Sequence, residues 1–438
     1  MLNISIRISD VLISVPLFTL STPTQRKAYA GTKVYRIPTG NQEQTDRISN
    51  MIATLGVPTW KSAKVAFSHV DVEVSKDRLT AFHDALKQIN PQVDSQLITM
   101  HDDLSVSIAK EAEGMNSPYR DAFVGFANAA WFTSYHTYAD HLTFLSDLVS
   151  TFPNNAKVVM GGTSYEGRPI TGINIFGSSG SGTKPAIIFH GTVHAREWIT
   201  TMVTEQIAYS LLSNYTTSAT IKSYVDKYDF YIFPVVNPDG FVYTQTTERL
   251  WRKNRQPPPS GTCYGRDINR NWPWKWDVAG GSSTSSCSET YRGAAAGDSP
   301  ENKGLAAFIN AKANSAAGAK LYVDWHSYGL YFMGPYGYSC SANAADKTEH
   351  TKLEQGFAAA FKAPYGKTLK TGPICSTIYQ VSGGSVDYAY DVSKIKYSFT
   401  PELRGGSSGS GFVLPPAEIL PSGIEAYEGV KYLLANMV

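Results

Sequence analysis

The sequence has little cysteine, little net charge and no long apolar run. None of its four cysteines forms a Cys-x-x-Cys pair, so thiolate zinc sites and redox motifs are not expected. Its 39 basic and 37 acidic side chains nearly cancel to a net charge of +2, which argues against a nucleic-acid partner or an anionic membrane partner. No apolar run is long enough to span a bilayer, so we do not expect a membrane protein.

Cysteine is confined to the C-terminal half of the chain. Four cysteines allow three pairings, and pairing each with its neighbour in the sequence closes the shortest loops. Disulfides are typical of an oxidising compartment, and the alternative is four buried free thiols. The four residues are Cys263, Cys287, Cys340 and Cys375.

The N-terminus carries features of a secretory leader. Arg7 precedes a short apolar stretch at 11–20, and Ala28-Tyr-Ala30 offers a small-residue cleavage pattern. We therefore expect residues 1–22 to be a signal peptide and the protein to be secreted. Asn214-Tyr-Thr216 is a candidate glycosylation site, and an unused tripeptide is an equal alternative.

The length of 438 residues predicts one large domain and a smaller one. Alternation at 33–37 and 63–74 predicts strands, and the apolar spacing within 77–89 predicts a helix. Residues 23–118 therefore read as a small α+β module. A polar connector near 110–120 follows, and its basic residues suit proteolytic cleavage.

Residues 119–438 alternate between strand-like runs and helical patterns. This alternation predicts an α/β domain in which helices enclose a largely buried, mixed sheet. The strand candidates are 186–190, 230–236, 321–325 and 397–400, and the helix candidates are 197–212, 301–314, 352–361 and 417–435.

His194 and Glu197 stand three residues apart where a strand gives way to a helix. Their side chains can reach one metal ion, although the pair taken alone is more typical of a surface histidine beside a helix-start glutamate. His326 follows another strand-like run, and catalytic groups gather at the carboxyl ends of strands in open α/β sheets. The three side chains would supply zinc with three protein ligands and leave one position open. We interpret His190 as a buried, hydrogen-bonded core histidine.

Seven motifs, in order along the chain, resemble those of the A/B-type zinc metallocarboxypeptidases. The resemblance spans nearly all of residues 119–438 and implies the fold of that family. The block before 119 resembles the family's inhibitory pro-segment, more in length and pattern than in motif. The motifs are His-Ala-Arg-Glu-Trp-Ile-Thr (194–200), Asn-Pro-Asp-Gly (237–240), Arg-Leu-Trp-Arg-Lys-Asn-Arg (249–255), Asp-Ile-Asn-Arg-Asn-Trp (267–272), His-Ser-Tyr (326–328), Ile-Tyr-Gln-Val-Ser-Gly-Gly-Ser (378–385) and Phe-Thr-Pro-Glu-Leu-Arg (399–404).

The resemblance implies a metal centre and its chemistry. His194, Glu197 and His326 match the ligands of one Zn²⁺ per chain, a ligand set known for this family. Asp267 matches the carboxylate that receives the other ring proton of the first histidine. Glu402 matches the general base that deprotonates the attacking water and then protonates the leaving amine.

A second set of residues matches the family's substrate contacts. Arg252 corresponds to the cation that stabilises the tetrahedral oxyanion. Asn269, Arg270 and Tyr379 correspond to the group that binds the terminal carboxylate, and we call these three residues the clamp. A planar guanidinium can engage a carboxylate through two hydrogen bonds. Arg196 and Tyr328 match accessory contacts further from the bond, although a local salt bridge is nearly as good an interpretation of Arg196.

The pocket for the terminal side chain is expected to be apolar. Its floor position in the family corresponds to Val386, where an acidic residue would select Lys or Arg ends. Ile378 and Phe412 are expected to add apolar walls. Because burying an uncompensated charge is costly, Val386 predicts release of aromatic or aliphatic residues.

The expected protein is thus a secreted zymogen that acts on peptide C-termini after cleavage by an activating protease, and we expect a monomer. Two alternatives stand beside it. A non-catalytic binding protein on the same fold would lack at least one catalytic group, and the sequence retains them all. A hydrolase of acyl-amino acids would keep the same carboxylate clamp, but the pro-segment and the apolar pocket favour peptides.

Overall fold

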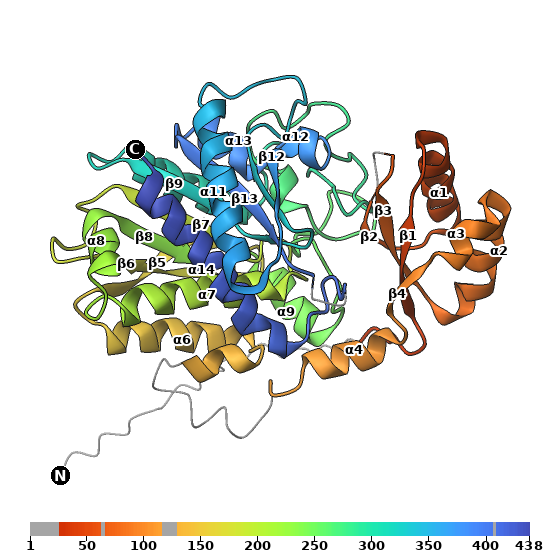
Figure 1. Ribbon diagram of the computed structural model, residues 1–438, viewed down its shortest axis with the longest axis horizontal. Helices are drawn as coiled ribbons and strands as arrows, with labels where there is room; N and C mark the ends of the chain where they lie inside the picture. The colour runs from red at the N-terminus through yellow and green to blue at the C-terminus, as the bar shows by residue number, and fades with distance from the viewer. Residues whose placement is uncertain (1–25, 63–65, 116–128, 406–408) are drawn as a thin grey trace, which may run out of the picture.

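The computed structural model describes residues 26–62, 66–115, 129–405 and 409–438. The predicted signal peptide and residues 116–120 of the connector lie outside the described residues. Two sheets organise the chain, one of four strands near the N-terminus and one of nine strands in the rest (Figure 1). Among the described residues, no helix is both long and apolar enough to cross a membrane.

The N-terminal module is a twisted antiparallel sheet with helices packed on it. The strand order is β2-β3-β1-β4, and buried apolar residues of the strands and helices form a separate small core. Helix α1 has local start and stop signals, since the Asn41 side chain accepts from the Gln44 amide and Gly56 ends the helix with a φ of 58°. The elements are β1 (Lys33–Pro38), α1 (Gln42–Leu55), β2 (Thr59–Lys61), β3 (His69–Val74), η1 (Lys76–Arg78), α2 (Leu79–Ile89), α3 (Pro91–Ser95), β4 (Ile98–His101) and α4 (Leu104–Glu111).

The large sheet is mixed, with parallel strands at its centre and an antiparallel edge. Its order is β12-β11-β13-β9-β7-β8-β6-β5, and β10 pairs with β13. The central strands β13, β9, β7 and β8 run parallel, while β5 and β6 form an antiparallel edge. The strands are β5 (Ala156–Thr163), β6 (Pro169–Ile175), β7 (Ala186–His190), β8 (Asp229–Phe233), β9 (Ala319–Asp324), β10 (His326–Ser327), β11 (Tyr331–Gly334), β12 (Lys370–Pro373) and β13 (Tyr397–Leu403).

Helices cover both faces of this sheet. Side chains of β7 divide between two cores, with Ile187 and Phe189 in one and Ala186 and Ile188 in the other. Helices α6, α7, α8, α11 and α14 contribute to the first core, and α10 and α13 contribute to the second. The helices are η2 (Ala129–Thr133), α6 (Tyr138–Thr151), α7 (Trp198–Ser213), α8 (Ala219–Lys227), α9 (Pro238–Thr246), η3 (Ile268–Arg270), α10 (Pro300–Ala313), α11 (Lys347–Tyr365), α12 (Ile374–Thr377), α13 (Ser385–Asp391), η4 (Pro416–Glu418) and α14 (Ile419–Asn436).

The predicted α/β class with a mixed, helix-covered sheet is confirmed. The strand predicted at 186–190 has the observed bounds of β7. The predicted strands at 33–37, 321–325 and 397–400 are shifted or lengthened by one to three residues, whereas those at 230–236 and 63–74 are shorter in the structure. The cysteines pair with their sequence neighbours, Cys263 with Cys287 and Cys340 with Cys375. The alternative of four free thiols is therefore wrong.

Candidate active site

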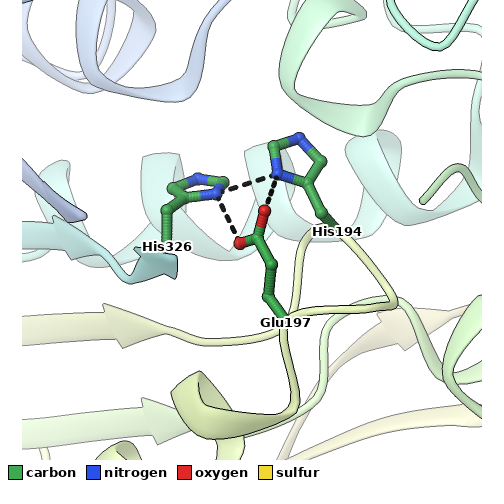
Figure 2. Close-up of side chains that lie close together, drawn as sticks. All are labelled: His194, Glu197 and His326. Carbon is green, nitrogen blue, oxygen red and sulfur yellow. Dashed lines mark hydrogen bonds and ion pairs between the residues drawn. The ribbon is translucent and has the colours of Figure 1, made fainter. Parts of the chain in front are cut away.

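Three buried side chains meet at the carboxyl ends of the central strands. His194 lies in the loop after β7, Glu197 caps the start of α7, and His326 opens β10 directly after β9. Figure 2 shows both imidazoles and the carboxylate pointing toward one another. Because β7 and β9 are parallel neighbours, their following loops reach the same edge of the sheet.

The donor atoms of this triad are close enough to share one ion. Glu197 Oε1 lies 2.8 Å from His194 Nδ1, Glu197 Oε2 lies 3.0 Å from His326 Nδ1, and the two Nδ1 atoms are 3.0 Å apart. All three donors fall within 4.8 Å of one another, and the described residues contain no other such group. Two facing imidazole nitrogens beside a buried carboxylate form the donor set that zinc favours, so these residues fit a zinc ion.

Asp267 connects the triad to a guanidinium. Its Oδ1 lies 3.1 Å from His194 Nε2, the ring nitrogen turned away from the triad, and its Oδ2 accepts from Arg252 Nη2 at 2.8 Å. Burial alone would raise the pKa of Asp267, but the charges of Arg252 and His194 outweigh it and hold the pKa well below its usual range. The aspartate therefore stays ionised between two cationic or proton-donating partners.

Glu402 is the carboxylate that faces the triad from the neighbouring strand. It lies on β13, where its backbone is in register with His326 of β10. Its Oε2 is buried without a hydrogen-bond partner among the described residues. Burial raises the pKa of Glu402 to about 7, and the negative charge of Glu197 adds to the rise.

A cavity of about 510 Å³, counted with the space open to solvent, lies beside His194, His326 and helix α13. Its lining combines polar and charged groups with apolar groups from α12, α13, β11 and the segments next to them. Its polar lining includes His194, Arg252, Asn269, Arg270, His326, Tyr379 and Glu402, and its apolar lining includes Met333, Ile374, Ile378, Val381 and Val386.

Two of the clamp residues, Asn269 and Arg270, are positioned by hydrogen bonds within the segment that follows Asp267. Asn269 and Arg270 lie in η3, which begins when the Asn269 amide donates to Asp267 Oδ1 at 2.9 Å. Arg270 is buried, and its Nη1 donates to the Asn269 carbonyl at 2.9 Å. Arg270 Nε has no hydrogen-bond partner among the described residues. A buried guanidinium with an unused donor beside a cavity is suited to an anionic ligand.

A second cavity of about 700 Å³ lies between the N-terminal module and the large domain. Arg196 and Tyr328 line it, as does Phe412. The expectation that Phe412 walls the pocket of Val386 is therefore corrected. Phe412 instead packs against Trp60 of β2, with ring centroids 5.5 Å apart, and the neighbouring Gly411 also lies close to that indole.

Arg196 makes the local salt bridge that was the alternative interpretation of this residue. Its Nη1 lies 3.3 Å from Glu289 Oε2 and its guanidinium lies 4.2 Å from the centre of the Phe412 ring. The expected core role of His190 is met, since it is fully buried and its Nδ1 lies 3.2 Å from the Tyr322 hydroxyl.

No role was predicted from the sequence for two residues near the triad, Asp324 and Ser385. Asp324 lies 3.1 Å from His326 Nε2, and the Ser385 hydroxyl donates to Asp324. One signal could have found Asp324, because residues two apart on a strand project to the same face.

A buried His-Glu-His set at a strand edge, beside a carboxylate and an arginine, defines a zinc-dependent hydrolase site. Residues 141–429 match the family model described as zinc carboxypeptidase. The chain belongs to the zinc carboxypeptidase family and is a metallocarboxypeptidase of the carboxypeptidase A type.

Relatives and solved structures agree with this assignment over almost the full chain. Metallocarboxypeptidase A of Trichophyton rubrum is 47% identical over 411 residues, which is 94% of each chain. Carboxypeptidase A2 of Rattus norvegicus is 35% identical over 414 residues, covering 94% of this chain and 95% of the relative. The crystal structure of thrombin-activatable fibrinolysis inhibitor superposes with a TM-score of 0.82 at 26% identity, covering 94% of this chain and 99% of that one.

Proposed function

We propose that the protein is a secreted zymogen whose processed form removes aromatic or aliphatic residues from peptide C-termini. One observation carries the catalytic part of the proposal. The two triad histidines, Glu402, Arg252 and the clamp residues around Arg270 all border a single cavity that also has apolar lining. A peptide end has the matching parts, namely a scissile carbonyl, a free carboxylate and a terminal side chain.

His194, Glu197 and His326 are the residues that would hold zinc. When bound, zinc supplies Lewis acidity, which polarises the scissile carbonyl and makes water easier to deprotonate. Asp267, beside His194 Nε2, keeps the ring proton on that nitrogen and leaves Nδ1 free to ligate.

The clamp explains selection of a free C-terminus. Arg270 is buried and borders the cavity together with Asn269 and Tyr379. A guanidinium fixed in this way can pair with the terminal carboxylate through two parallel hydrogen bonds. An internal peptide bond presents no carboxylate there, so only the last bond is held in position for attack.

Glu402 transfers the proton in both halves of the reaction. It takes a proton from the attacking water while the water oxygen bonds to the carbonyl carbon. It then gives that proton to the amide nitrogen as the C–N bond breaks, which releases a carboxylic acid and an amine, and these ionise to carboxylate and ammonium at neutral pH. Arg252 compensates the negative charge that develops on the carbonyl oxygen in between.

The terminal side chain meets apolar groups. Val386, which is 3% exposed, and Ile378 line the same cavity as the clamp. Asp387 also borders this cavity, but its carboxylate accepts the amides of Gly337 and Tyr338 at 3.0 and 2.9 Å. The carboxylate of Asp387 is therefore bound by backbone amides and is not free to pair with a cationic side chain of the substrate, which favours apolar ends.

The experiment is a substrate panel on the processed enzyme, with peptides ending in Phe, Leu, Lys or Glu. Phe or Leu ends should be released fastest, and preferential cleavage of Lys ends would contradict the specificity. Glu402→Gln should lower kcat by roughly 10²- to 10⁴-fold with zinc content unchanged. Glu354→Gln is the matched control, because Glu354 is also buried with a pKa raised to about 7 by burial but lies outside both cavities. Full activity of Glu402→Gln would reject its role as base.

The zymogen part rests on contacts between the N-terminal module and the second cavity. Trp60 packs on Phe412, and the Tyr328 hydroxyl donates to Asp71 Oδ2 at 2.6 Å. Asp71 is in turn held by Arg36 through two hydrogen bonds of 2.8 Å. These contacts occupy Tyr328 and Phe412, so a longer substrate cannot lie along these two residues while the module is docked.

Secretion is supported by the two disulfides, which persist in oxidising compartments. The test of both claims is expression with the natural N-terminus. The protein should appear in the medium without its leader, and its intact form should be much less active than the form cleaved near 110–120. Equal activity of the two forms would remove the claim of inhibition, and retention in the cytosol would remove the claim of secretion.

A further inference from the structure

Asp324 is a fully buried carboxylate directly behind one of the triad histidines. It is the last residue of β9, is 0% exposed and lies in register with His190 of β7. Asp324 and His326 are two residues apart along an extended segment, so their side chains project to the same face. Trp325 between them projects to the opposite face and belongs to the first core.

The contacts of Asp324 aim its carboxylate at the far nitrogen of the His326 ring. Oδ2 lies 3.1 Å from His326 Nε2 and accepts from the Ser385 hydroxyl at 2.5 Å. Its backbone carbonyl is fixed by the Thr400 hydroxyl at 2.8 Å.

The other polar neighbour of His326 Nε2 cannot accept its proton. That neighbour is Asn269 Nδ2 at 3.2 Å. Asn269 Oδ1 accepts the Ser385 amide at 2.8 Å, which fixes the amide orientation and leaves an NH₂ group facing the ring. When Nδ1 of His326 ligates a metal, the ring proton lies on Nε2, and the anionic acceptor beside it is Asp324.

We infer that Asp324 is the positioning residue of His326, in the way that Asp267 is for His194. It selects the tautomer with a free Nδ1 and fixes the ring plane toward the metal. This inference rests on the zinc site proposed above and extends it by a second carboxylate–histidine pair. Partners of this kind change metal affinity by about 10- to 100-fold.

Ser385 gives this pair a connection to the substrate pocket. Its hydroxyl holds Asp324 and its amide holds Asn269, while the next residue, Val386, is part of the apolar wall. The start of α13 therefore fixes the metal ligand and the clamp together, which keeps the reacting groups in register.

The test measures zinc affinity of the full-length chain by competition with a chelator, together with the visible spectrum of the cobalt-substituted protein. Asp324→Asn should bind zinc about 10- to 100-fold more weakly and show a changed cobalt spectrum. Ser385→Ala should give a smaller loss in the same direction. Asp229→Asn is the matched control, since Asp229 is also 0% exposed but begins β8 at the opposite end of the sheet.

Wild-type affinity and spectrum in a folded Asp324→Asn protein would overturn the inference. If that variant does not fold, wild-type affinity in Ser385→Ala overturns it instead. An equal loss in Asp229→Asn would also overturn it, because the effect would then follow from losing any buried aspartate. His326→Ala separates the two levels of the argument. If it retains zinc, the proposed ligand set fails, whereas if it loses zinc while Asp324→Asn does not, only the positioning role fails.

Discussion

Trp60 is the residue of the N-terminal module whose removal should most clearly release the site. It is 6% exposed and its ring lies 5.5 Å from the rings of both Phe412 and His101. The indole also covers Gly411, where an added Cβ would come within 2.8 Å of it. Trp60 therefore belongs to a core cluster that the module shares with the large domain.

The variant Trp60→Ala should weaken the docking of the module. Truncating a buried Trp to Ala costs about 3–5 kcal/mol. Part of this cost falls within the module, because Trp60 Nε1 donates to Glu73 at 3.3 Å. With about 1.4 kcal/mol for each factor of ten, about 3 kcal/mol at the interface raises the undocked fraction roughly 10²-fold.

The assay compares initial rates on a Phe-ended peptide for the uncut precursor and for the same sample after processing. Uncut Trp60→Ala should be far more active than the uncut wild type, and the two processed enzymes should be identical because Trp60 has been removed. Phe67→Ala is the matched control, since Phe67 is an aromatic of the same module that is 84% exposed. A folded, uncut Trp60→Ala precursor as silent as the wild type would refute the reasoning.

Three further predictions concern the pocket, the disulfides and pH. Val386→Asp should lower kcat/KM for Phe-ended peptides at least about tenfold, because a buried carboxylate disfavours apolar ends. It should raise kcat/KM for Lys-ended peptides, because the carboxylate can pair with the ammonium group. An unchanged order of preference between Phe and Lys ends would contradict this prediction. Replacing Cys263 and Cys287 by serine opens a loop with a sequence separation of 24 and should lower the free energy of unfolding by about 3.5 kcal/mol, measured with urea; no change would contradict the estimate. Burial raises the pKa of Asp387 from 3.8 to about 7, so its contribution to stability is present in acid and is lost as pH rises from about 4 through about 7. The slope of unfolding free energy against pH in this window should therefore become less negative in Asp387→Asn, and an identical profile would show that Asp387 does not titrate there.

The central strands were predictable because their sequences are apolar throughout. Parallel strands buried on both faces appear as short continuous runs, and the run at 186–190 is one of them. Convergence of His194 and His326 followed from the same fact, since both come after parallel strands. The boundaries of the helices were less predictable because tertiary packing decides where the last turns end.

The position of Phe412 could not be read from the sequence. Its apolar character suits either cavity, and the choice depends on Trp60, a residue of a different module. Asp324 was missed for another reason. A carboxylate next to a strand end is ordinarily a surface charge, and only the packing of α13 over β9 buries it against His326.

The four carboxylates in and around the triad differ in their hydrogen-bond and ion-pair partners. Asp267 is shared by His194 and Arg252, Glu197 by both histidines, and Asp324 by His326 and Ser385. Asp324 keeps one buried oxygen without a partner while its other oxygen is hydrogen-bonded, whereas Glu402, which also has a buried oxygen without a partner, forms no side-chain hydrogen bond among the described residues. A buried polar atom left without a partner costs stability, so a fold that retains one keeps it for another reason. The carboxylates held by hydrogen bonds therefore fix geometry, and Glu402, whose carboxylate forms no such bond among the described residues, is the group with capacity to exchange a proton with a substrate in the cavity.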